Sequence, residues 1–118
     1  MRLANTSTWL AISFQLKRSK SMSASITVEI INKKGLHARA AAKFVKTVAA
    51  HNAQVQVIKL AQESEEASPP VQGSSLLGLM MLGADPGSRL AISAEGEQAQ
   101  QVVDALKELV EGRFGEAE

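Results

Sequence analysis

The chain of 118 residues has no cysteine, and this absence excludes disulfide bonds, thiolate metal sites and cysteine nucleophiles. It also fits the reducing environment of the cytoplasm. Aromatic residues make up only 3% of the sequence, so binding of nucleic acid by base stacking is not expected. No apolar run approaches the roughly 18 residues that a membrane-spanning helix needs. We therefore expect a cytoplasmic protein without nucleic acid or membrane insertion.

Acidic residues are absent before Glu29, whereas the first 21 residues contain four of the 13 basic ones. From Met22 on, this leaves nine basic against 12 acidic residues, a net charge of about −3 that argues against a nucleic-acid surface. Residues 1–21 have a short apolar patch, but most of their charge follows it, unlike a secretory signal. We interpret 1–21 as a disordered extension, or as the result of an upstream start with Met22 as the true initiator, and 22–118 as the domain.

The length and a composition of 45% hydrophobic and 21% charged residues predict one globular domain. Hydrophobic periodicity predicts strands at 25–31, 53–60, 67–71 and 89–94, and helices at 38–50, 76–82 and 97–111. A polar loop is expected at 62–66 and a frayed acidic tail from Gly112 on. The order β-α-β-β-α-β-α predicts an α+β fold whose helices cover one face of an antiparallel sheet.

The most informative stretch begins at Gly35, where a histidine enters a strongly helix-forming segment. A helix start has N–H groups without intrahelical partners and the positive end of the helix dipole, so an anion beside His37 would be stabilised. Imidazole is nucleophilic and largely neutral near neutral pH, so His37 is suited to accept a phosphoryl group. Arg39 adds a cationic fork for phosphate, although the helix dipole slightly disfavours it there. The alternative is a capping histidine and a solvated arginine. His51, at the end of the same helix, is expected to have no chemical role.

A second apolar segment, 76–82, follows Ser75 and consists almost entirely of leucine and methionine. Either this helix is buried on all sides, or it exposes a surface for partner proteins, with Leu76, Leu79 and Met80 as the docking residues. Ser75 is a typical helix N-cap, and that role needs no further explanation. A phosphate on Ser75 would also lie at a helix N-terminus, so regulatory phosphorylation is the alternative.

Three segments, 32–39, 75–83 and 92–97, resemble the HPr family of histidine phosphocarriers of the bacterial phosphotransferase system. The resemblance extends over about residues 25–110, and the segments 30–33, 79–82 and 112–118 are more similar to the nitrogen-related (NPr) branch. It implies an HPr-like open-faced β-sandwich that carries a phosphoryl group on His37, with Arg39 stabilising the phosphate. It also implies an enzyme I-type donor, an EIIA-type acceptor, and a role in nitrogen-related regulation or sugar transport. Ser75 matches the serine that a kinase modifies in some members.

One position departs from the family pattern, because the residue after the arginine is commonly proline and is Ala40 here. Ala40 restores an N–H at the helix start, which either gives the phosphate another hydrogen bond or loosens the turn. Two functions remain open: a phosphocarrier, or a regulatory module that binds partners stoichiometrically through 76–82. An enzyme is not expected, because the chain has two histidines, no cysteine and no acid–base constellation. We expect a monomer that needs neither cofactor nor metal.

Overall fold

The structure, a computed structural model, describes residues 22–62 and 66–118. The predictions for the extension at 1–21 and for the centre of the polar loop at 62–66 lie outside these residues. The described elements are, in chain order, β1 (Ser23–Glu29), α2 (Ala38–Ala49), β2 (Gln54–Lys59), β3 (Val71–Gln72), α3 (Leu76–Met81), β4 (Arg89–Glu95), α4 (Ala99–Glu111) and the 3₁₀ turn η1 (Arg113–Gly115). The first seven follow the predicted order.

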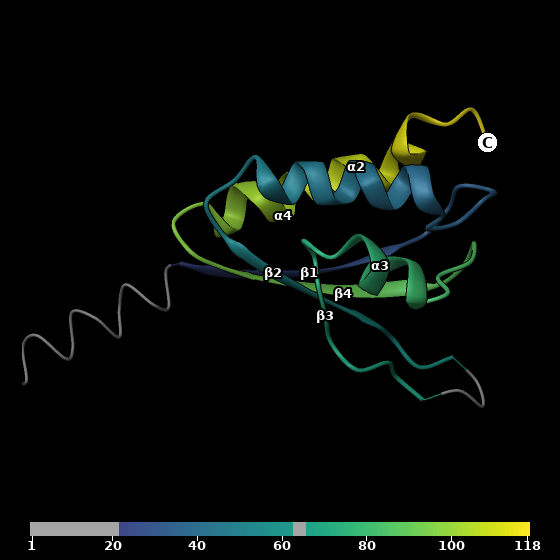
Figure 1. Cartoon of the computed structure of the whole chain (residues 1–118), viewed down its shortest axis with the longest axis horizontal. Coiled ribbons are helices and arrows are strands. Elements are labelled where there is room, and N and C mark those ends of the chain that lie inside the picture. Colours follow the sequence, from purple (N-terminus) through teal and green to yellow (C-terminus); the bar gives the residue numbers. More distant parts are fainter. Residues whose placement is uncertain (1–21, 63–65) are drawn as a thin grey trace, which may run out of the picture.

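The strands form one antiparallel sheet in the order β1-β4-β2-β3. Ile26, Ile92 and Val57 lie in register across β1, β4 and β2, and the last two are fully buried. The helices α2 and α4 contact each other and lie together over one face of the sheet (Figure 1). The predicted α+β fold with its helices over one face of an antiparallel sheet is therefore confirmed.

The core lies between this sheet and the helices. Apolar residues recur every three or four positions in both long helices, so each helix has one buried face. The buried residues of α2 are Ala40, Ala41, Phe44 and Val48, and those of α4 are Ala99, Val102, Val103, Leu106 and Val110. Burial of one large apolar side chain stabilises the fold by about 1.5–3 kcal/mol. This packing fixes α2 on the sheet and thereby fixes the position of its N-terminus.

Two segments differ from the sequence predictions. The strand expected at 67–71 is reduced to Val71–Gln72, because Pro69 and Pro70 have no N–H to donate to a neighbouring strand. The tail from Gly112 on is not frayed: Phe114 is fully buried, and η1 turns the segment back over the start of α2 (Figure 1). A single aromatic anchor in a polar segment explains this difference.

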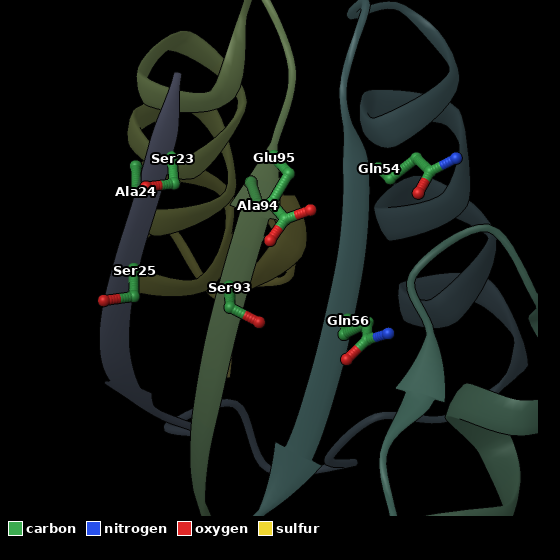
Figure 2. A pocket seen from close by; sticks show the side chains of 8 residues that line it. All are labelled: Ser23, Ala24, Ser25, Gln54, Gln56, Ser93, Ala94 and Glu95. Atoms are coloured by element: carbon green, nitrogen blue, oxygen red, sulfur yellow. The ribbon is translucent and has the colours of Figure 1, made fainter. Parts of the chain in front are cut away.

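The opposite face of the sheet is polar and has no helix over it among the described residues. Ser25, Ser93 and Gln56 lie in register across β1, β4 and β2, and Figure 2 shows their side chains on this face. They line a shallow hollow of about 430 Å³ together with Glu95 and Gln54. These uncharged groups and one carboxylate form no constellation for catalysis.

Candidate functional site

The turn before α2 is fixed by a close backbone approach at Gly35. Its φ is +69°, a left-handed conformation that side chains with a Cβ rarely adopt. A Cβ on Gly35 would lie 2.5 Å from the carbonyl oxygen of Ala84, the residue whose oxygen also accepts the Leu36 N–H at 2.9 Å. Leu36 is buried. The turn is thus packed against the loop that follows α3, and the next residue, His37, becomes the N-cap of α2.

The imidazole of His37 is held at both ring nitrogens. Its Nδ1 accepts the backbone N–H of Arg39 at 3.3 Å, and its Nε2 contacts the Glu116 carboxylate. An N–H can donate only to a nitrogen with a free lone pair, so the neutral ring carries its proton on Nε2 and donates it to Glu116. The Nδ1 lone pair therefore faces the first turn of α2.

Glu116 is held in turn by Asn32, whose fully buried amide donates to the carbonyl of Gly35 at 2.8 Å and to Glu116 Oε1 at 2.9 Å. The pKa of Glu116 lies below its ordinary value because its carboxylate accepts these hydrogen bonds from Asn32 and His37, while burial opposes the shift. The positive charge of nearby Lys34 acts in the same direction as the hydrogen bonds. A charged carboxylate therefore faces His37 at neutral pH.

Basic side chains surround this contact. His37 lines a hollow of about 450 Å³, which four basic residues also line: Lys33, Lys34, Arg39 and Lys43. The guanidinium of Arg39 is exposed and makes no ion pair or hydrogen bond within the described part of the chain. Lys33 pairs with Glu118 at 3.5 Å, an exposed pair of small energetic value. Because these four basic residues outnumber the two carboxylates that also line the hollow, Glu116 and Glu118, the hollow is suited to an anion.

The start of α2 supplies further donors for an anion. The amide of Ala41 donates to the His37 carbonyl at 2.8 Å and that of Arg39 to Nδ1, which leaves the amide of exposed Ala38 for a ligand. Ala40 is fully buried within a continuous helix, so alanine in place of the common proline does not interrupt the first turn. The Ala38 amide and the helix dipole favour a phosphoryl group beside Nδ1.

His51 is separated from this site by the length of α2. Its Nδ1 contacts the carbonyl oxygen of Thr47 at 2.7 Å, at the C-terminal end of the helix. The twelve residues of α2 lie between the two histidines and separate them by about 20 Å. His51 therefore lies apart from the basic hollow at His37.

The helix α3 has the N-cap that its sequence predicts, since Ser75 Oγ accepts the Gly78 N–H at 3.0 Å. The surface of α3 is strongly apolar. Its exposed side chains are Leu76 (43%), Leu77 (68%), Met80 (42%) and Met81 (75%). Leu79, by contrast, is fully buried, so its expected docking role is corrected: it packs in the core. The helix packs against α2, and the loop after it contacts the Gly35 turn.

Two groups at the site were not predicted as functional residues. These groups are Asn32 and Glu116. Asn32 belongs to the recognisable turn before Gly35, but its amide reaches Glu116, which is 84 residues away in the chain.

In the described part of the chain, no group of three or more histidine, cysteine or acidic side chains could hold a metal ion. No helix among those residues is long and apolar enough to cross a membrane.

Comparisons with known proteins identify the family of the chain. A family model described as "PTS HPr component phosphorylation site" matches residues 24–112. The phosphocarrier protein HPr of Pseudomonas aeruginosa is 42% identical over 94 residues, which are 80% of this chain and 98% of the relative. The HPr of Neisseria meningitidis is 40% identical over 92 residues, or 78% of this chain and 96% of the relative.

Solved structures show the same fold. HPr-C-His from Thermoanaerobacter tengcongensis superposes with a TM-score of 0.69 at 37% identity, covering 80% of this chain and 99% of that one. An HPr from Bacillus anthracis superposes with a TM-score of 0.64 at 30% identity, covering 75% of this chain and 96% of that one. The family match includes the His37 turn, α3 and most of the sheet, and it makes the protein a phosphocarrier rather than a catalyst. The chain belongs to the HPr family of phosphocarrier proteins of the phosphotransferase system.

Proposed function

We propose that His37 accepts a phosphoryl group from an enzyme I-type protein and passes it to an EIIA-type acceptor. The observation that carries this proposal is Nδ1 of His37, which accepts the Arg39 N–H in the first turn of α2, beside the free Ala38 amide and in a basic hollow. A phosphoryl group at Nδ1 would be stabilised by the helix dipole and by the positive charge of Arg39. No other histidine of the described residues has such surroundings.

The transfer needs only small movements at the site. The Nδ1 lone pair forms a bond to phosphorus, and the bond between phosphorus and the donor breaks with its electron pair remaining on the donor. The Arg39 N–H then moves from Nδ1 to a phosphoryl oxygen, where the guanidinium of Arg39 also neutralises charge. Removing the Arg39 guanidinium should slow acceptance without preventing it.

A reconstituted relay tests this role. Phosphoenolpyruvate, an enzyme I and an EIIA are mixed with the wild type, with His37→Ala and with the matched control His51→Ala. We expect label on the wild type and on the control, and none on His37→Ala. The label should be acid-labile and base-stable, as a phosphohistidine is and a phosphoserine is not. Label retained by His37→Ala would refute the assignment.

The exposed face of α3, formed by Leu76, Leu77, Met80 and Met81, is proposed as the docking surface for both partners. Flexible methionine side chains adapt to more than one binding surface, and the face adjoins the turn that carries His37. The double variant Leu77→Ser/Met81→Ser should raise the KM for both partners and leave the fold intact. Unchanged KM values would place docking elsewhere.

The same exposure supports a second candidate function, stoichiometric regulation through this face. An unphosphorylated partner would then bind His37→Ala as tightly as the wild type, and the Leu77→Ser/Met81→Ser variant much more weakly. Binding that depends on His37 phosphorylation alone would exclude this function. A titration by calorimetry separates the two results.

Two finer assignments also remain proposals. The segments 30–33, 79–82 and 112–118 favour nitrogen-related regulation over sugar transport, and competition between a nitrogen-type and a sugar-type EIIA for the phosphorylated protein tests this preference. Ser75 is proposed as a site of regulatory phosphorylation: its partly exposed hydroxyl lies next to Leu76 and Leu77, so a phosphate there would add charge beside the docking surface. Weaker EIIA binding after kinase treatment would support that role.

A further inference from the structure

The contact at Nε2 of His37 comes from a part of the chain that the family match does not include. That match ends at residue 112, whereas Glu116 lies four residues further on. Glu116 belongs to the C-terminal segment, which we define as residues 112–118, and its role depends on the contacts of that segment.

This segment is anchored on both sides of Glu116. Before it, Phe114 is fully buried and its carbonyl oxygen accepts the Lys43 ammonium at 2.5 Å. After it, the carbonyl oxygen of Glu118 accepts the Lys33 N–H at 2.9 Å. The backbone between these anchors is also fixed, because the Glu116 N–H donates to the carbonyl oxygen of Arg113 at 2.9 Å. The carboxylate is thus presented to His37 by a short, tethered segment.

The side chain of Glu116 is itself oriented. One oxygen accepts a hydrogen bond from the amide of Asn32. This amide is fully buried and also donates to the carbonyl oxygen of Gly35, in the turn before His37. The other oxygen is left for the Nε2–H of His37. A carboxylate with one oxygen tied to a rigid turn defines the plane and direction of the imidazole, in the way that carboxylate partners orient histidines elsewhere.

We infer that Glu116 is a positioning residue for phosphoryl transfer: it holds the Nε2 proton of His37, so that Nδ1 alone is presented to the donor. This inference rests on the proposed function of His37 and adds to it a second residue from the C-terminal segment. It also assigns Asn32 as the group that keeps Glu116 in place.

The charge balance of the step explains why a carboxylate suits this position. When Nδ1 bonds to phosphorus and the donor leaves with its electron pair, the ring keeps its Nε2 proton and becomes cationic. Glu116 shares that positive charge. In the onward transfer the bond from Nδ1 to phosphorus breaks, its electron pair returns to Nδ1, and the ring is neutral again with Nε2 still protonated. Glu116 therefore assists both directions and is not consumed.

The test uses a small inorganic donor, phosphoramidate, which transfers its phosphoryl group, releases ammonia and needs no partner protein. The wild type, Glu116→Ala and the matched control Glu118→Ala are labelled with ¹⁵N-histidine, phosphorylated and kept at alkaline pH. Coupling between ³¹P and ¹⁵N then identifies the phosphorylated nitrogen. Glu118 lies in the same segment and pairs with Lys33, so its removal controls for changes in the segment and its charge.

We expect phosphate on Nδ1 of the wild type and of Glu118→Ala, with at least about a tenfold preference, as expected for one charge-assisted hydrogen bond. In Glu116→Ala the ring keeps only its contact with the Arg39 N–H and is less firmly oriented, so a substantial fraction of the phosphate should be on Nε2. An unchanged ratio in this variant, or phosphate on Nε2 of the wild type, would overturn the inference. Thermal unfolding separates loss of the fold from loss of orientation.

A second measurement needs no variant. At alkaline pH, the ¹⁵N shifts of unmodified His37 should show a protonated Nε2 and an unprotonated Nδ1, and the opposite tautomer would contradict the inference. If phosphoramidate gave the expected ratios while an enzyme I failed to label the protein, the positioning role of Glu116 would stand and the proposed relay would not.

Discussion

Replacing Phe114 with alanine removes the buried side chain that holds the C-terminal segment against the domain. If the segment detaches, the loss is the transfer free energy of the aromatic ring, about 1.5–3 kcal/mol. If it stays and leaves a cavity, the loss is about 3–5 kcal/mol. The strain of the left-handed backbone at this position, φ 55°, is similar for phenylalanine and alanine and largely cancels. We therefore expect a loss of about 3 kcal/mol in the free energy of unfolding.

Urea denaturation measures this loss, and with a typical slope the midpoint should fall by about 2 M. Ala117→Ser is the matched control, because Ala117 is exposed in the same segment and its replacement should change stability by less than about 0.5 kcal/mol. The ring ¹⁵N signals of His37 should also change in Phe114→Ala, because Glu116 is no longer held beside the imidazole. A midpoint equal to that of the control would show that the segment is not packed on the domain, and the account of Glu116 would fail with it.

Other changes probe the turn and the carboxylate. Gly35→Ala forces a left-handed backbone on alanine and places its Cβ 2.5 Å from the Ala84 oxygen. We therefore expect the free energy of unfolding, measured in urea, to fall by about 2 kcal/mol or more, and the labelling of His37 to be slower. Unchanged values would show that the turn does not require glycine. The pKa of Glu116, followed by ¹³C NMR, should lie below the ordinary 4.5 and rise toward it in Asn32→Ala. Because this pKa is lowered by folding, its contribution to stability is present above the unfolded value and disappears as the pH falls through the folded one. A pKa at or above 4.5 would contradict the contacts of Glu116.

The parts of the fold that depend on local patterns could be predicted from the sequence. Alternating apolar residues indicated three of the four strands closely, and the helical spacing of Phe44 and Val48 indicated the buried face of α2. His37 was also predictable, because Gly35 before it and the alanines after it together define a turn that opens a helix. Each of these signals lies within one element.

The rest depends on contacts between distant residues. The helix α3 is almost wholly apolar, so its sequence does not indicate which side faces the core. The sequence therefore could not show that Leu79 is buried while its neighbours are exposed. Glu116 meets His37 across 79 residues of sequence. The composition of its segment, mostly glycine and glutamate, is typical of a frayed end, although the segment contains Phe114. Residue types alone do not indicate the left-handed backbone at this phenylalanine.

The central claim is that His37 carries the phosphoryl group, and the most direct test is to locate that group on the unmodified sequence. The wild type is phosphorylated with phosphoenolpyruvate and an enzyme I, digested without exposure to acid and fragmented in a mass spectrometer by a method that keeps the label. We expect one phosphoryl group per chain, on His37. A phosphoryl group on His51 or Ser75, with His37 unmodified, would contradict the account.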